Sequence, residues 1–552
     1  MHDKYDAVVI GGGHNGLVAA AYLGKAGKRV ALIERNRTLG GCSSTDETSW
    51  PGYKISSAAY VISLFQPKII KELELKDRYG LTIIPRNPSS FTPDLEGPGL
   101  VLGNHPNGQS LTHTEISRYS KTDAESFSRY EKHLENIVKK IEPIIEEVPF
   151  NLQPFKNFSR LGVDLSQFLK TSVCMASLGS NLLHAFELFA GAATPILDRW
   201  FESDILKATL ATDAIIGTHL APSQKGSAYV LLHHVMGEAG GARGVWGYVQ
   251  SGMGGLADAL ELACIDAQVD ILKKHQVTKI MTNYSGRAVG VTVEYGAGSN
   301  KTSSDIKTDV VVSSLDCNLT FFELLKSQGL SQKNIKKFQR IDYTSASLKM
   351  NLALDKLPKF RLGKEIARDF NPLTGTIHIP NTMQAIESAY ADSQSGKPSE
   401  CPILEMSIPS TVDPTVAPAG KHIMGIFIQY APYQLNDHLG GPSGWDSLKD
   451  EFGNQCVDII EEHAPGFKDS IIHRQIITPL DLEKKFGLTQ GNIFQGAMKF
   501  PMSMGPFRPI IGYADHRTPI KGLYLCGAAT HPGGGVMGIC GKNAALEILK
   551  DL

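Results

Sequence analysis

The sequence lacks the cysteine spacing that marks two common kinds of site. Its 552 residues include eight cysteines, and no two of them form a C-x-x-C pair. Dithiol redox centres and many zinc sites are built on such pairs, so the spacing argues against both and no metal site is expected. The simplest interpretation is that the thiols are reduced, as they are in a cytosol-like compartment.

An excess of one charge and a long uninterrupted apolar run are also missing. The 55 basic and 56 acidic residues give a net charge of −1, so nothing favours nucleic acid as a partner. The most apolar long window, residues 173–197, is interrupted by Ser177, Asn181, His184 and Glu187. It therefore does not predict a membrane span. It predicts a buried helix pair or an apolar surface, and such a surface would allow peripheral contact with a membrane.

Length and composition predict a globular protein of more than one domain. A chain of 552 residues is too long for one ordinary core, and its 42% hydrophobic and 20% charged residues are an ordinary globular balance. The first predicted strand begins almost at Met1, which leaves no room for a signal or transit peptide before it. We therefore expect a cytoplasmic location.

What the sequence does contain is a complete βαβ pattern near its start. An apolar run at residues 7–10 is followed by Gly11, Gly13 and Gly16 in a G-x-G-x-x-G arrangement. A helical stretch at 17–26 and a second apolar run at 29–33 follow, and Glu34 ends that run. This order is the dinucleotide-binding fingerprint.

Each residue type in the pattern has a physical role. Gly11 allows the tight turn, Gly13 lets the backbone approach a pyrophosphate, and Gly16 lets the helix and strand pack closely. The N-terminus of the helix offers free N–H groups and a partial positive charge to the phosphates, and His14 and Asn15, in the loop before it, are expected to bind the cofactor. Glu34 can accept hydrogen bonds from ribose hydroxyls, and its charge disfavours a 2′-phosphate.

The residues after Glu34 help to distinguish FAD from NAD. Arg35 is followed by the pair Gly40–Gly41 and then by Cys42. This sequence resembles the extended dinucleotide motif of FAD-binding oxidoreductases of the phytoene desaturase and amine oxidase type. The resemblance implies FAD as the cofactor and places the second glycine turn near its pyrophosphate. A plain glycine turn is the alternative, and a buried loop thiol is a simpler interpretation of Cys42 than a reactive one.

The same resemblance extends to later segments. A glycine loop, a helix, a strand containing Val277 and a V-V-V-S-S strand end are similar to the FAD-binding half of the family. The resemblance implies that the backbone at Val277 meets the adenine. It also implies that Ser57 and Ala58 lie against the flavin, although an ordinary core strand explains that segment equally well.

The C-terminal segment contains a strand at 523–525, a glycine-rich turn at 527–535 and a helix predicted at 537–550. In the resembling enzymes this helix points at the flavin pyrimidine ring, where its dipole would stabilise negative charge. The residues implied here are Gly527, Ala528, Gly535, Val536 and Met537. Ala528 departs from the pattern, because many FAD enzymes have a carboxylate there, so a backbone N–H would have to serve. A second phosphate site and a plain packing turn are the alternatives.

The sequence therefore predicts an α/β fold, with an FAD-binding Rossmann-type domain and an inserted substrate domain of mixed antiparallel sheet and helices. The expected FAD-binding segments are 1–80, 221–330 and 506–552. The expected substrate segments are a helical one at 81–220 and one at 331–505.

A flavin carries the hard chemistry itself, so no catalytic triad is required. The side chains considered for catalysis are His531 beside the expected flavin, His234 and Trp246. His233 and His234 are adjacent and would point in opposite directions on a strand, so a structural histidine is the stronger interpretation. Trp246 and Tyr248 would share a strand face and could line an apolar site.

The expected activity is hydride transfer to FAD from an apolar small molecule, such as a lipid or polyene. A flavin amine oxidase is the alternative enzyme. A flavin-bearing binding or regulatory protein with little turnover is the alternative of another class.

Overall fold

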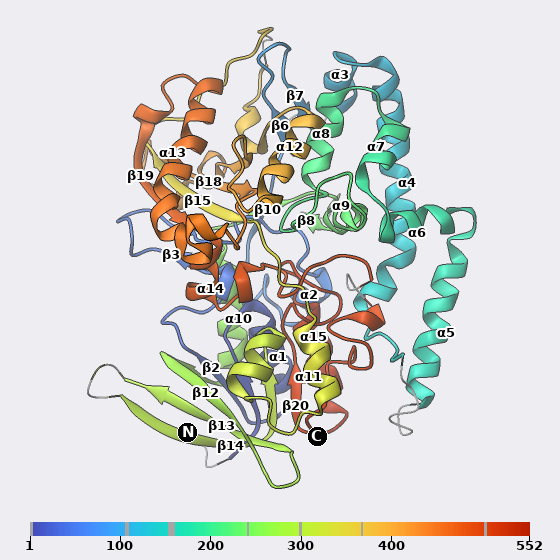
Figure 1. Ribbon diagram of the computed structural model, residues 1–552, viewed down its shortest axis with the longest axis vertical. Coiled ribbons are helices and arrows are strands. Elements are labelled where there is room, and N and C mark those ends of the chain that lie inside the picture. Colours follow the sequence, from blue (N-terminus) through green and yellow to red (C-terminus); the bar gives the residue numbers. More distant parts are fainter. Residues whose placement is uncertain are drawn as a thin grey trace.

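The computed structural model describes residues 4–104, 110–152, 161–239, 242–296, 298, 301–365, 368–501 and 505–552. Figure 1 shows a cofactor-side sheet with its helices at the bottom, a second sheet at the upper left, and a layer of helices on the right. Chain segments far apart in sequence combine in each of these parts.

The first sheet has seven strands in the order β11-β2-β1-β14-β13-β12, with β20 paired to β14. The strands β11, β2, β1, β14 and β20 pair in parallel, whereas β12, β13 and β14 form an antiparallel meander. Their bounds are β1 Lys4–Ile10, β2 Val30–Glu34, β11 Asp270–Lys273, β12 His275–Thr282, β13 Ala288–Tyr295, β14 Thr302–Ser313 and β20 Leu523–Leu525. The central strands are continuous apolar runs because helices and loops cover both faces.

Helices α1 (His14–Lys25), α10 (Gly254–Asp266) and α15 (Ile539–Leu549) pack together against this sheet. Their alanines allow the close approach: Ala19, Ala20 and Ala21 of α1 are buried, as are Ala544 and Ala545 of α15. The cofactor-side domain is thus assembled from the start, middle and end of the chain, as the sequence predicted.

The second sheet also has seven strands, in the order β19-β15-β18-β17-β16-β6-β7. The strand bounds are β6 Ser90–Thr92, β7 Leu100–Leu102, β15 Leu348–Leu354, β16 Thr376–Ile379, β17 Ile403–Ser407, β18 His422–Gln429 and β19 Ile471–Ile477. One face packs on a core that includes Met350, Ile426 and Trp445. Helices α13 (Trp445–His463) and α14 (Pro479–Phe486) pack on this core, whereas α12 (Met383–Gln394) packs with the helical layer.

Within the described residues, the helical layer contains seven helices. They are α3 Thr112–Ser117, α4 Lys121–Glu146, α5 Leu161–Ser177, α6 Leu182–Ala190, α7 Ala193–Trp200, α8 Asp204–Thr212 and α9 Ser227–Val235. The long helix α4 begins at a side-chain cap, since the Ser120 hydroxyl accepts the N–H of Asp123. Its apolar stripe, which includes Phe127, Leu134 and Ile141, packs against α7 and α9.

Smaller elements join the two domains. Strands β5 (Ile83–Pro85) and β10 (Gly247–Val249) pair over three residues each. Two shorter ribbons pair β3 (Thr45–Asp46) with β4 (Ile55–Ser56) and β8 (Glu238–Ala239) with β9 (Ala242–Arg243). Helices α2 (Pro67–Glu72) and α11 (Gln332–Gln339) flank the cofactor sheet.

The structure corrects two of the expected domain boundaries. Helix α9 contacts α4, α6 and α7, so the segment starting at 221 begins in the helical layer and not in the cofactor domain. Phe338 of α11 stacks on Phe321 in the cofactor-side core, with ring centroids 4.0 Å apart. The cofactor-side segment therefore extends past residue 330.

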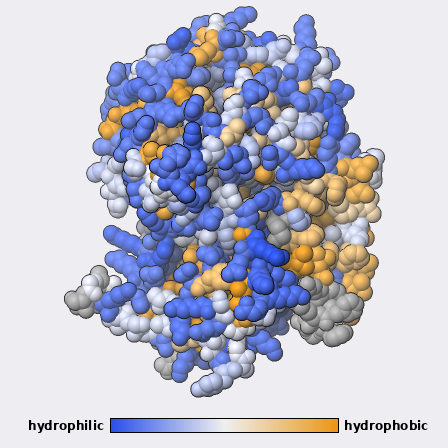
Figure 2. Space-filling model, in the orientation of Figure 1, coloured by the Kyte–Doolittle hydropathy of each residue, from blue (hydrophilic) through white to orange (hydrophobic). Residues whose placement is uncertain are grey.

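One surface of the helical layer is unusually apolar. Figure 2 shows orange side chains gathered on the right-hand side, over the region that Figure 1 assigns to α5 and α6. Asp164 is the one buried residue of α5, and Val173, Leu183 and Phe186 are 68%, 80% and 59% exposed. No described helix is by itself long and apolar enough to cross a membrane; α5 and the segment Gly179–Ala190 meet that criterion only together, and they are bent by 98°.

Candidate cofactor and substrate site

A cavity of about 1080 Å³ runs from the glycine loop of β1 to the second sheet. One end lies at the carboxyl ends of β1, β2 and β14, where Ile10, Glu34 and Ser314 line it. Ligands of open α/β sheets bind at this edge. The other end is walled by β15, β16, β17 and β18 and by the helical layer, so one space connects the cofactor edge with the second domain.

The glycine loop has the geometry that its sequence predicted. Gly11 has φ +91°, a left-handed conformation that favours glycine, and a Cβ there would come within 2.5 Å of the Ser314 hydroxyl. A Cβ on Gly16 would lie 2.1 Å from the carbonyl oxygen of Gly11, so helix and loop touch at that point. Gly13 differs, because its φ is −68° and a Cβ there would meet no protein atom within 4 Å.

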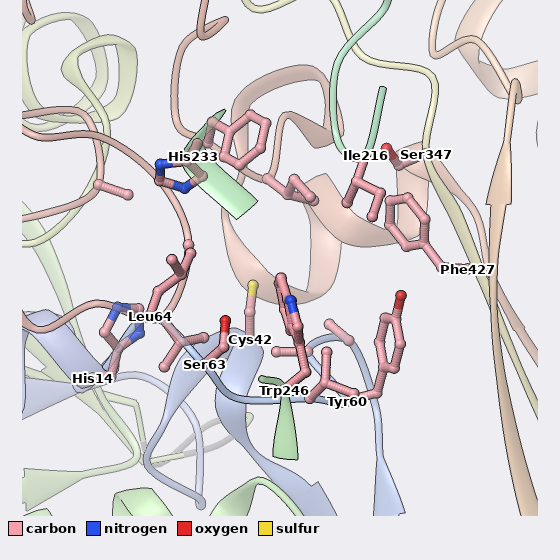
Figure 3. A pocket seen from close by; sticks show the side chains of 18 of the residues that line it. His14, Cys42, Tyr60, Ser63, Leu64, Ile216, His233, Trp246, Ser347 and Phe427 are labelled. Carbon is pink, nitrogen blue, oxygen red and sulfur yellow. The ribbon is translucent and has the colours of Figure 1, made fainter. Parts of the chain in front are cut away.

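The fold therefore does not require a glycine at position 13. A side chain there would project into open space beside the cavity. His14 is a second indication that a group binds here. Its Nε2 is buried with no hydrogen-bond partner among the described residues, and its ring lies at the cavity in Figure 3. Burial lowers the pKa of His14 to about 4, so the ring is neutral at pH 7. An open cradle beside a helix N-terminus and an orphaned buried nitrogen fit a bound dinucleotide.

Glu34 is fixed at the end of β2. Its two carboxylate oxygens accept the N–H groups of Gly12, at 2.7 Å, and Asn36, at 2.8 Å. The side chain is buried and lines the cavity, and each oxygen can accept a further donor such as a ribose hydroxyl. Arg35 also lines this end, and its guanidinium donates to the carbonyl oxygens of Lys484 and Lys485.

The second glycine turn lies directly against the first, as expected. The N–H of Gly40 donates to the carbonyl oxygen of Gly12 at 2.8 Å, and Gly13 and Gly40 form an isolated parallel bridge. Gly40, Gly41 and Cys42 all line the cavity. Cys42 is half-buried, and desolvation raises the pKa of its thiol to about 12, so the thiol is protonated at pH 7.

Several other expected cofactor residues reach the cavity: Asn15, Ala58, Val277, Ala528, Gly535 and Val536. Two do not. Ser57 is buried and absent from the lining, and its carbonyl oxygen accepts from Asn351. Gly527 packs against the chain instead, because a Cβ there would lie 2.3 Å from the carbonyl oxygen of Ser314.

The expectation for Met537 is corrected. Helix α15 begins at Ile539, with Gly538 as its N-cap, so Met537 precedes the helix. Its N–H donates to the carbonyl oxygen of Gly535 at 3.1 Å, and its side chain packs into the core of the helical layer. Within the first turn of α15, the N–H of Gly541 points to the Asn15 amide oxygen at 3.4 Å. The Met537 N–H is thus already engaged within the chain.

His531 is also corrected. It is fully buried and does not line the cavity. Its Nδ1 accepts the N–H of Gly505 at 2.8 Å, and its Nε2 lies 3.1 Å from the carbonyl oxygen of Ile144. Burial lowers its pKa to about 3. A neutral ring with both nitrogens engaged by backbone joins three segments and has no free site for proton transfer.

The two remaining catalytic candidates are placed differently. His233 and His234 lie on helix α9 and not on a strand; His233 lines the cavity, whereas the His234 side chain falls outside the described part of the chain. Trp246 does line the cavity, beside Tyr60 in Figure 3. Trp246 and Tyr248 share a side of their segment as expected, since the Arg86 guanidinium lies 5.9 Å from each ring.

Sequence reasoning missed the polar side chains at the second-sheet end. Arg86, Lys349, His378, Glu405 and Asp213 all line the cavity there. The available signal was polar residues at alternate positions of otherwise apolar strands, as with K and N in L-K-M-N-L-A-L for β15. Only the strand pairing brings these residues together.

Comparisons with known proteins agree with this geometry. Residues 9–73 match the NAD(P)-binding Rossmann-like domain. The chain is 40% identical to pyridine nucleotide-disulfide oxidoreductase domain-containing protein 2 of Rattus norvegicus, over 100% of this chain and 94% of that protein. It is 28% identical to a limonene dehydrogenase polypeptide of Castellaniella defragrans, over 99% and 95%. The crystal structure of an oxidoreductase from Methanosarcina mazei superposes with a TM-score of 0.58 at 18% identity, covering 99% of both chains.

Proposed function

Because the chain belongs to the oxidoreductase family of pyridine nucleotide-disulfide oxidoreductase domain-containing protein 2, we propose that it uses FAD to oxidise an apolar small molecule. The observation that carries this proposal is the single cavity that joins the open Gly13 cradle to a second, separately folded wall. Such a cavity can hold a dinucleotide and a substrate side by side. FAD, when bound, accepts the hydride that leaves the substrate.

The chain's own residues bind and orient. Backbone N–H groups at the start of α1 would hold the phosphates of a bound dinucleotide, and Glu34 would accept hydrogen bonds from its ribose hydroxyls. Leu64, Phe127, Leu134, Ile216 and Leu231 supply apolar walls that exclude water from the reacting centre. All eight cysteines are free in the described residues.

The relative from Castellaniella defragrans is named for limonene, an apolar hydrocarbon, which supports an apolar substrate for this chain as well. The test is anaerobic incubation of the purified holoprotein with lipids, polyenes and amines, followed at the flavin absorption band. We expect a lipid or polyene to bleach the band. A panel in which only amines do so would contradict the proposal.

A flavin amine oxidase is the second candidate. The observation in its favour is an aromatic pair in the cavity: the rings of Tyr60 and Phe427 stack with centroids 6.3 Å apart and planes 29° from parallel. Amine oxidases of this fold type carry such a pair close to the flavin. The third candidate is a flavin-bearing binding protein. In that case no substrate would reduce the flavin.

We also propose that the apolar surface of α5 and α6 contacts a membrane peripherally from the cytoplasm. The exposed side chains of this surface are Leu161, Val163, Leu165, Phe168, Leu169, Val173, Leu182, Leu183 and Phe186. A contiguous exposed apolar patch favours an interaction surface over an ordinary solvated face. An apolar substrate partitions into lipid, so a membrane-facing patch on the substrate side of the fold would help its entry.

A further inference from the structure

Four side chains form one row across the second sheet. The strand register places His378 of β16 opposite Glu405 of β17, Glu405 opposite Phe427 of β18, and Phe427 opposite Lys349 of β15. Residues directly opposite one another share a face of the sheet, so all four face the cavity that they line. We call them the sheet row. The other face of the same strands packs on the apolar core, so the polar side chains of the row lie on the cavity side.

Lys349 is the most deeply buried cation of the row. It is 2% exposed, and its ammonium has no hydrogen-bond partner in the described structure. Its Nζ lies 4.3 Å from the centre of the Tyr60 ring. A Cβ on Gly425 would lie 2.3 Å from that nitrogen, so the glycine of β18 leaves the room in which the ammonium sits. The charge of Glu405 acts on this ammonium, but a buried ammonium that donates no hydrogen bond is costly, which points to an acceptor that binds from the cavity.

Arg86 approaches the same space from the end of β5. It is 7% exposed, and its guanidinium donates to the Thr376 hydroxyl and stacks on Trp246 and Tyr248. Its Nε is buried with no hydrogen-bond partner in the described part of the chain. Arginine presents a planar fork of donors that matches a carboxylate, and here that fork lines a cavity.

Two carboxyls limit how much negative charge the site can take. Glu405 accepts from the Tyr60 hydroxyl, and Asp213 lines the cavity after helix α8. The two carboxylates already balance the two cations, so each further negative charge is unfavourable and a dianion costs more than a monoanion. A monoanion fits better, and the leucine and phenylalanine side chains of the neighbouring helical wall suit an apolar remainder.

We propose that the sheet row and Arg86 bind the carboxylate of an amphipathic, monoanionic substrate whose apolar part lies along the helical wall. Arg86 and Lys349 are the two cationic ligands, and Tyr60 and Glu405 fix the position of the ammonium. This inference rests on the proposed function, since it assigns the substrate end of the same cavity. It replaces a fully apolar substrate by one with a single acidic head.

The test is isothermal titration calorimetry of the protein as purified, with its cofactor bound. Three probes share one tail: octanoate, 1-octanol and octyl phosphate. The variants are Arg86→Met and Lys349→Met, which keep a long apolar side chain. Arg361→Met and Lys364→Met are matched controls, because both side chains are exposed on the same domain.

We expect octanoate to bind at least tenfold more tightly than 1-octanol, and each site variant to lose at least tenfold in octanoate affinity. The controls should match the wild type, and 1-octanol should bind all five proteins alike. Unchanged octanoate affinity in both site variants would overturn the inference, and so would octyl phosphate binding more tightly than octanoate.

Folding and function are checked separately. Removing a buried cation that lacks a full set of hydrogen bonds should leave the melting temperature unchanged or raise it. If Arg86→Met nevertheless melts at a lower temperature and binds 1-octanol more weakly, the octanoate comparison rests on Lys349→Met. Failure of the proposed function would appear as missing FAD or as a flavin that no substrate reduces. Failure of this inference would appear as charge-independent binding in a protein that retains its FAD.

Discussion

Gly13 is the residue whose role the structure isolates most clearly. Its backbone conformation is open to any residue, and a Cβ there meets no protein atom within 4 Å, so only a bound group would be displaced. We expect Gly13→Val to fold and to lose most of its FAD. Gly162→Val is the matched control, because a Cβ there also meets nothing. The FAD-to-protein ratio and the melting temperature are measured for both, and normal FAD content in folded Gly13→Val would refute the assignment.

The protonation of Lys349 should make the binding of an acidic ligand depend on pH. Burial lowers the pKa of Lys349 to about 7, partly opposed by the charge of Glu405. The ammonium is charged below that value and neutral above it, so octanoate should bind more weakly as the pH rises from 6.5 to 8.5. Calorimetry across this range should show the decline in the wild type and much less of it in Lys349→Met.

The neighbours of Lys349 do not imitate this effect. Burial lowers the pKa of His378 to about 3 and raises that of Tyr60 well above its usual value, so both stay neutral over the range. Burial raises the pKa of Asp213 to about 6, so the last part of its titration falls at the low end of the range and is present equally in wild type and Lys349→Met. An equal pH dependence in wild type and Lys349→Met would contradict the role given to the ammonium.

At the scale of elements, helix α14 links the second sheet to the cavity, which its residues Leu482 and Phe486 line. Its start is a capping box: the Thr478 hydroxyl accepts the N–H of Asp481, and the Asp481 carboxylate accepts the N–H of Thr478. We expect Thr478→Ala to lower the free energy of unfolding by about 1 kcal/mol. Thr478→Ser keeps the cap oxygen and should lose much less. Equal losses in urea unfolding would show that the cap is not what stabilises this end.

Sequence patterns predicted those elements whose signal is local. In the βαβ unit, the elements predicted to end at residues 10, 26 and 33 end at Ile10, Lys25 and Glu34, because apolar period and glycine positions determine them. The sheet row was not predicted, because register between distant strands cannot be read from one strand. His531 was misplaced for a similar reason: its partners Ile144 and Gly505 come from segments far away in the sequence or across a loop.

At the scale of the whole molecule, the apolar surface of α5 and α6 makes a prediction about membranes. Leu183 and Phe186 are 80% and 59% exposed, so changing both to serine should not disturb the core. We expect this double variant to sediment with phosphatidylcholine vesicles several-fold less than the wild type. Leu262 and Ile265 of α10, which are 46% and 53% exposed, are changed to serine as the control. Equal sedimentation of both double variants would exclude this surface as the contact.

The arrangement of domains explains why one cavity can serve both cofactor and substrate. Three separate stretches of chain build the first sheet, and the second sheet is inserted between them, so the cavity lies where the chain repeatedly crosses from one domain to the other. The cofactor end is made from backbone and glycine, and the substrate end from side chains on adjacent strands. Relatives could therefore change substrate by changing the sheet row while keeping the cofactor loop.

The central claim is that the open cradle at Gly13 holds FAD. The most direct measurement is to denature the purified protein with acid, separate the soluble fraction by chromatography and quantify any nucleotide against protein. The account predicts a yellow protein that releases one FAD per chain. Recovery of NAD, or of a flavin that stays covalently attached to the precipitate, would contradict it.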